Sequence, residues 1–171
     1  VISGGGNVVI VSGNNITNYS GAEITSGADM ILSGLTLYNE EYIKSGGDMF
    51  LLFEDRLDNK SSSTSTEARI LSYGDLFIAS RIAGDGVRDM HNKWARIASK
   101  GDMYIAAGNL TNEGRDYTSG SLGVSQTNTG AWANNNTVVR GYQTITGSNI
   151  YTDYSDILAA GNITFYGNNL T

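Results

Sequence analysis

Hydrophobic and polar positions repeat one short phrase several times along this chain. An isoleucine, a small residue, a turn with Gly and Asp, and an alternating apolar run follow in the same order in two clear copies, "ARILSYGDLFIASRI" (Ala68–Ile82) and "ARIASKGDMYIAAGNL" (Ala95–Leu110). Further copies begin at Glu23, Tyr42 and Asp156, and a weaker one begins at Gly5. Repetition of one unit at a period of roughly 20–50 residues is typical of solenoid proteins.

An Asp or Asn that follows the turn marks each copy, and we call these residues the markers: Asn7, Asp29, Asp48, Asp75, Asp102 and Asn162. The intervals between them are 22, 19, 27, 27 and 60 residues. In the copies after the first, an isoleucine stands five positions before the marker: Ile24, Ile43, Ile70, Ile97 and Ile157. Apolar positions within each copy alternate with period two, which indicates strands. The sequence therefore predicts an all-β fold, a parallel β-helix with rungs of about 19–27 residues whose isoleucines stack in a column.

Longer intervals between markers predict insertions on the surface. The polar, Ser/Thr-rich stretch Glu54–Glu67 and the stretch Gly84–Arg96 are predicted to be loops. The 60-residue interval contains an irregular insertion at about residues 111–154, which we interpret as one or two degenerate rungs with a protruding loop or hairpin. The whole chain, residues 1–171, is interpreted as a single β-helix segment of a longer protein.

The charge and hydropathy of the chain limit its partners. A net charge of −6 disfavours nucleic acid and anionic membranes, because both require a basic face. No apolar run reaches the ~18 residues of a membrane-spanning helix, so no membrane-spanning segment is expected. The chain has neither cysteine nor the spacing of a known metal, phosphate or calcium motif, so we expect no cofactor and no metal site.

The repeated phrase, with its Ile, Ser, Gly-Asp and alternating apolar run, resembles the haemagglutinin repeats of filamentous haemagglutinin-like exoproteins, which are two-partner secretion proteins of Gram-negative bacteria. The resemblance is clearest over residues 22–110 and 156–171 and weak over 111–154. It implies a right-handed β-helix, secretion through an outer-membrane transporter to the cell surface, and the role of a stalk in adhesion or contact-dependent growth inhibition. The family assigns no catalytic residues to these repeats.

The markers invite an enzymatic interpretation, because β-helix enzymes that act on polysaccharides gather carboxylates on one face. Asp29, Asp48, Asp75 and Asp102 follow the repeat instead of breaking it, which favours a role in the turn. Acids outside the marker positions that could serve a polysaccharide-degrading enzyme are Asp116, Asp153 and Asp156.

Contact with a partner is the stronger functional hypothesis. Basic and aromatic residues gather in Gly84–Arg96, and Trp and Arg are favoured at interfaces. The candidate contact residues there and in the irregular insertion are Arg88, His91, Lys93, Trp94, Arg96, Trp132 and Tyr142. His91, the only histidine, has few partners for catalysis. We expect a non-enzymatic adhesive stalk that contacts a protein or glycan on a target cell, with a polysaccharide-degrading enzyme and a passive spacer as alternatives.

Overall fold

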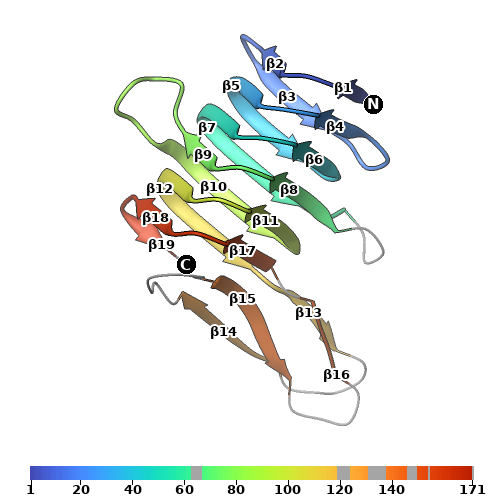
Figure 1. Ribbon diagram of the computed structural model, residues 1–171. Coiled ribbons are helices and arrows are strands. Elements are labelled where there is room, and N and C mark those ends of the chain that lie inside the picture. Colours follow the sequence, from blue (N-terminus) through green and yellow to red (C-terminus); the bar gives the residue numbers. More distant parts are fainter. Residues whose placement is uncertain (63–66, 119–123, 131–137, 146–149, 154, 171) are drawn as a thin grey trace.

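The computed structural model of this chain describes residues 1–62, 67–118, 124–130, 138–145, 150–153 and 155–170 (Figure 1). Side chains are described for residues 1–62, 67–114 and 155–168. Throughout this part of the chain the regular structure consists of strands, without a helix of the length and apolarity that crossing a membrane requires. The all-β prediction is therefore confirmed.

The first sheet stacks one short strand from each repeat. Adjacent strands pair in parallel from β1 to β17. In spatial order this parallel part contains β1 (Ile2–Gly4), β4 (Glu23–Ser26), β6 (Tyr42–Ser45), β8 (Ala68–Ser72), β11 (Ala95–Ser99) and β17 (Ser155–Ala159). Two antiparallel strands, β15 (Val138–Ile145) and β14 (Val124–Gly130), continue this sheet beyond β17.

The second sheet is also parallel, and each repeat contributes either one long strand or two short ones. The long strands are β5 (Met30–Asn39), β7 (Met49–Lys60) and β12 (Met103–Glu113). The short pairs are β2 (Val8–Val11) with β3 (Asn15–Asn18), β9 (Leu76–Ala79) with β10 (Val87–Lys93), and β18 (Ile163–Tyr166) with β19 (Asn169–Leu170). Each short pair lies beside the two halves of a long strand. Between β5 and β7 the register shifts by one residue at Gly34/Thr36, where the two halves meet.

Equivalent residues of successive repeats are direct neighbours, and this confirms the predicted isoleucine column. Ile24, Ile43, Ile70, Ile97 and Ile157 are in register along the first sheet, and each is at most 3% exposed. The second sheet faces them with further columns, such as Leu32, Leu51, Ile78 and Ile105. Each such side chain contributes about 1.5–3 kcal/mol through burial. The core therefore lies between the two sheets and runs along the direction of stacking.

The chain alternates between the sheets and returns one level further each time, from β4 through β5 to β6 and β7, and onward to β12 (Figure 1). A repeat can bury its apolar face only against its neighbours, which is the physical reason for the repetition. This arrangement of parallel, stacked strands fits a β-solenoid.

Both predicted loops are shorter than the sequence indicated. Residues 54–60 of Glu54–Glu67 belong to β7, which leaves 61–67 as the connection to β8, with 63–66 outside the described residues. In Gly84–Arg96, residues 87–93 form β10, and β11 begins at Ala95. The protruding loop of this repeat is 80–86, between β9 and β10 (Figure 1). Period-two alternation is weak in "VRDMHNK", so a strand with a charged outer face resembled a polar loop.

Antiparallel pairing distinguishes the 111–154 region from the repeats. Strand β13 (Arg115–Thr118) pairs with β16 (Ile150–Asp153), and β14 pairs with β15. The two pairs lie beyond the last stacked repeats at the lower end in Figure 1. Because β15 occupies the edge of β17, the first sheet continues into this region by a change in strand direction.

Candidate functional site

The markers form a ladder along the turn between the two sheets. In each repeat the backbone N–H of a marker donates to the side-chain Oδ1 of the marker one repeat earlier, at 2.8–3.1 Å. The ladder runs through Asn7, Asp29, Asp48, Asp75, Asp102 and Asn162. Each carboxylate therefore joins two repeats, which confirms the predicted role of the marker residues in the turn.

The glycine before the marker is required by a close approach. A Cβ built at Gly74 would lie 2.1 Å from Oδ1 of Asp48, and one at Gly101 would lie 2.0 Å from Oδ1 of Asp75. Positive φ angles among the described glycines occur instead at Gly21 and Gly84. At these positions contact with the marker of the preceding repeat, and not a positive φ, is therefore what excludes a side chain.

Strands β10 and β11 divide the predicted contact cluster Arg88, His91, Lys93, Trp94 and Arg96 between two faces. Arg88, His91 and Lys93 lie on β10 in the second sheet, and Arg96 lies on β11 in the first sheet. Trp94 is the single residue between the two strands. The sequence placed these five residues on one loop, whereas the fold separates Arg96 from the others by a corner.

Carboxylates on neighbouring strands neutralise the basic residues of β10. Arg88 pairs with Asp55 at 2.6 Å, and Lys93 pairs with Glu113 at 2.6 Å. His91 Nδ1 lies 3.7 Å from Asp58. Such exposed pairs contribute little to stability, but they remove the net positive charge that the sequence indicated.

Two groups beside this cluster have shifted pKa values. A hydrogen bond from Asn109 is the main cause that lowers the pKa of Asp89, and Arg88 adds to the effect. On the adjacent strand, a hydrogen bond to Asp58 raises the pKa of Arg56. Both shifts favour the charged forms, so this face carries fixed opposite charges at neutral pH.

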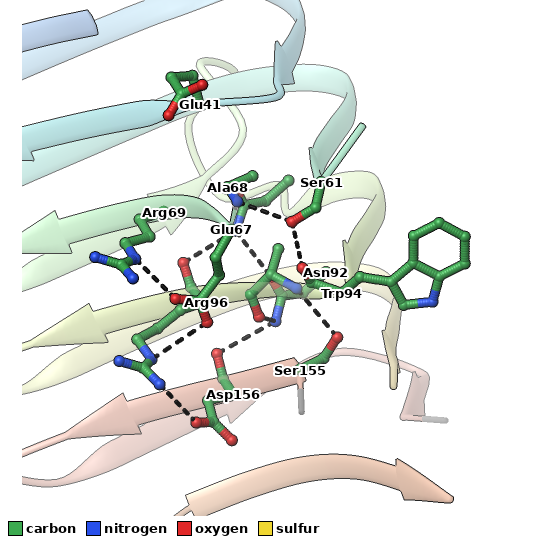
Figure 2. Close-up of polar contacts among 12 residues, drawn as sticks. Glu41, Ser61, Glu67, Ala68, Arg69, Asn92, Trp94, Arg96, Ser155 and Asp156 are labelled. Carbon is green, nitrogen blue, oxygen red and sulfur yellow. Dashed lines mark hydrogen bonds and ion pairs between the residues drawn. The ribbon is translucent and has the colours of Figure 1, made fainter. Parts of the chain in front are cut away.

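Trp94 occupies a strained corner. Its φ is 56°, in the left-handed region that a bulky side chain rarely adopts. Its backbone N–H donates to Glu113 O at 3.0 Å, its indole Nε1 donates to Gly114 O at 3.2 Å, and its carbonyl accepts from Ser61 Oγ. The ammonium of Lys93 lies 4.8 Å from the ring centre, and that of Lys60 lies 6.0 Å from it. Figure 2 shows the indole directed away from the polar contacts on the other side of the corner.

Those polar contacts centre on Glu67, which lies between Arg69 and Arg96 (Figure 2). Glu67 Oε2 is 2.7 Å from Arg69 Nε, and Glu67 Oε1 is 3.7 Å from Arg96 Nε. Arg96 also reaches Asp156 at 3.4 Å, and the Asp156 side chain is 5% exposed. Asp156, one of the acids considered for an enzyme, is thus a buried partner of Arg96. The side chains of Asp116 and Asp153 lie outside the described residues.

The two remaining contact candidates are placed only in part. Trp132 lies outside the described residues, and Tyr142 belongs to β15, whose side chains are not among those described. Their predicted role in partner contact stays a prediction. Among the side chains that are described, no group of three or more His, Asp or Glu could hold a metal ion.

One surface was missed from the sequence. The residue two positions after each marker points outward from the second sheet, and in the first five repeats these residues form an apolar column that ends beside Thr164: Val9, Ile31, Phe50, Phe77 and Tyr104. The rings of Phe50 and Phe77 stack at 4.9 Å with 5° between their planes. Val9 is 61% exposed and Tyr104 is 38% exposed. The sequence did contain a sign of this surface: an apolar residue stands at an outward position, where the alternation of a strand predicts a polar side chain.

Comparisons of the chain with protein-family models, with curated proteins and with solved structures found no match.

Proposed function

We propose that this chain is a non-enzymatic stalk segment of a secreted, filamentous haemagglutinin-like exoprotein, and that its backbone follows a right-handed parallel β-helix. It is exported through an outer-membrane transporter and displayed at the bacterial surface. There it acts in adhesion or in contact-dependent growth inhibition, by presenting outward-facing residues to a protein or glycan of a target cell.

The observation that carries this proposal is the stacking of successive repeats with equivalent residues opposite one another. Isoleucines, markers and outward residues keep the same neighbours from the first repeat to the last. A chain stacked in this way is stiff along the stacking direction, because each level is joined to the next by a continuous strand ladder and by a marker hydrogen bond. Stiffness combined with a repeated outer surface suits a protein that holds a contact site away from its own cell.

Binding to intact cells tests the adhesive part of the proposal. We expect fluorescently labelled chain to bind Gram-negative cells or cultured epithelial cells saturably, with competition by unlabelled chain. Trp94→Gly is the variant of choice for the corner cluster, because glycine adopts a φ of 56° without strain, and we expect the variant to fold. Reduced binding by this variant supports contact through the corner.

Unsaturable binding to both cell types contradicts an adhesive role and favours a passive spacer. Saturable binding that Trp94→Gly leaves unchanged keeps the adhesive function and removes the corner cluster from the contact surface. A thermal unfolding curve of the variant that matches wild type is the control for folding.

A further inference from the structure

Tyr104 separates two hollows on the outer face of the second sheet. One hollow, of about 270 Å³, is lined by Phe77, Tyr104, Thr164 and three polar residues of the marker ladder, Asp75, Asp102 and Asn162. The other, of about 390 Å³, lies between Tyr104, Tyr166 and the 80–86 loop, with Ser80 and Asp85 on its wall. Sizes in this range suit small ligands or single units of a longer ligand.

One aromatic ring at these hollows stacks on a neighbouring ring, and Tyr104 belongs to a strand whose backbone is paired on both sides. Phe77 stacks on Phe50, so its ring orientation is fixed on one side by a neighbour. Tyr104 stands on β12, which is paired on both sides, with β9 and with β18. Rigid aromatic groups lose little conformational freedom on binding, which favours affinity.

Polar acceptors beside the rings are fixed as well. Oδ1 of Asp75 accepts from the backbone of Asp102, and Oδ1 of Asp102 accepts from Asn162, each at 2.8 Å. Within the described residues neither Oδ2 has a hydrogen bond, so each carboxylate keeps an oriented acceptor at the rim. Among the residues that the structure describes, neither hollow has a lysine or arginine on its wall.

Two classes of ligand fit this surface poorly. An extended peptide cannot pair with β12, on which Tyr104 stands, because both edges of this strand already have partners. Anionic ligands meet Asp75, Asp85 and Asp102 without a compensating cation. A neutral sugar chain matches better, since a pyranose presents an apolar C–H face to an aromatic ring and donates hydroxyl hydrogen bonds to carboxylates and amides.

We propose that the surface around Tyr104 binds a neutral oligosaccharide, with sugar units in the hollows on either side of the ring. This deepens the adhesive function proposed above and rests on it for its biological role, although sugar binding itself is measured independently. Phe77, Tyr104 and Tyr166 supply stacking surfaces, and the marker side chains of Asp75, Asp102 and Asn162 supply hydrogen-bond acceptors.

Calorimetric titration of the purified chain tests this proposal, with chitohexaose, maltohexaose and cellohexaose as neutral probes and heparin as the anionic probe. We expect at least one neutral probe to bind and heparin not to bind. Tyr104→Ala should weaken that binding roughly tenfold, because it removes the ring between the hollows, while Tyr104→Phe should retain it. Tyr73→Ala is the matched control, since Tyr73 is 44% exposed next to β8 of the first sheet.

Failure of all three neutral probes to bind overturns the proposal, as does preferential binding of heparin or equal affinity for wild type and Tyr104→Ala. Competition by the bound hexasaccharide in the cell-binding assay links the two proposals. Saturable cell binding without any sugar binding rejects only this inference and indicates a protein receptor. Sugar binding without cell binding rejects only the adhesive function.

Discussion

At the scale of single residues, contacts between the marker of one repeat and the marker of the next hold the repeats in register. A marker side chain accepts a hydrogen bond from the following repeat, and it lies where a Cβ of the glycine in that following repeat would stand. Ala28 occurs in place of this glycine only in the repeat that follows Asn7. The glycine of one repeat therefore depends on the aspartate of the repeat before it. Within a single repeat, the two positions are adjacent in sequence.

Gly101→Ala tests this dependence. The new methyl group would approach Oδ1 of Asp75 to about 2.0 Å, so the carboxylate must move and its bond to the Asp102 backbone is lost. We expect a loss of about 1–3 kcal/mol in the free energy of unfolding, measured by urea denaturation. In a chain that already carries Asp75→Ala, Gly101→Ala should lower the free energy of unfolding by less than it does in the wild type. Gly5→Ala is the control, because a Cβ there meets nothing within 4 Å; equal losses for both single variants would contradict the close-contact explanation.

At the scale of elements, the sequence predicted most of the strands. It did not predict the asparagine hydrogen bonds that join the second halves of the long strands in successive repeats. Asparagines at the end of these strands form a buried ladder in which each side-chain Nδ2 donates to the next Oδ1 at 2.7–2.8 Å: Asn18, Asn39, Asn59, Asn92 and Asn112. Four of these asparagines stand 10 or 11 residues after the marker of their repeat. Asn92 does not, because the 80–86 loop displaces it from that offset, as it displaces Met90 from the leucine column.

The same loop explains why the candidate site was harder to predict than the fold. The fold could be predicted because the apolar residues of the buried columns recur at similar distances from each marker. Outward-facing residues are free to vary, so the pairing of Arg88 with Asp55 or the approach of Lys60 to Trp94 depends on which strands become neighbours. Strand neighbours across a 33-residue separation cannot be read from local pattern once an insertion has shifted the register.

Asn59→Ala should show that the asparagine ladder is a structural element. Asn39 Nδ2 would lose one of its acceptors, Asn92 Oδ1 would lose the donor from Asn59, and the Arg96 carbonyl would lose a hydrogen bond of 3.0 Å. Each buried group without a partner is expected to lower the free energy of unfolding by about 1–3 kcal/mol, as measured by chemical denaturation. Asn18→Ala, at the end of the ladder, removes only the donor to Asn39 and to the Tyr42 carbonyl, so its effect should be smaller. A larger effect for Asn18→Ala would argue against a continuous ladder.

At the scale of the whole molecule, stability should be a sum over levels and their interfaces. Each repeat contacts the ones beside it in sequence through both sheets, and the core columns pass through all of them without a central closure. Such quasi-one-dimensional proteins tolerate the loss of a complete repeat, whereas the loss of part of a repeat breaks every column at once.

Deletion of residues 76–102 removes one complete repeat of 27 residues, from the position after Asp75 to Asp102. It joins Asp75 to Met103, so β12 can take the place of β9 and β10 beside β7, and β17 can pair with β8 in unchanged register. We expect this variant to unfold cooperatively, with a strand-type circular dichroism spectrum and a lower Tm because one interface is missing. Deletion of residues 76–88 removes 13 residues, about half a repeat. This variant should not unfold cooperatively, because the inward-facing residues of the remaining half repeat no longer lie opposite those of its neighbours. Loss of cooperative unfolding in both variants would show that the levels are not interchangeable, and the stalk proposed from their stacking would lose its physical basis.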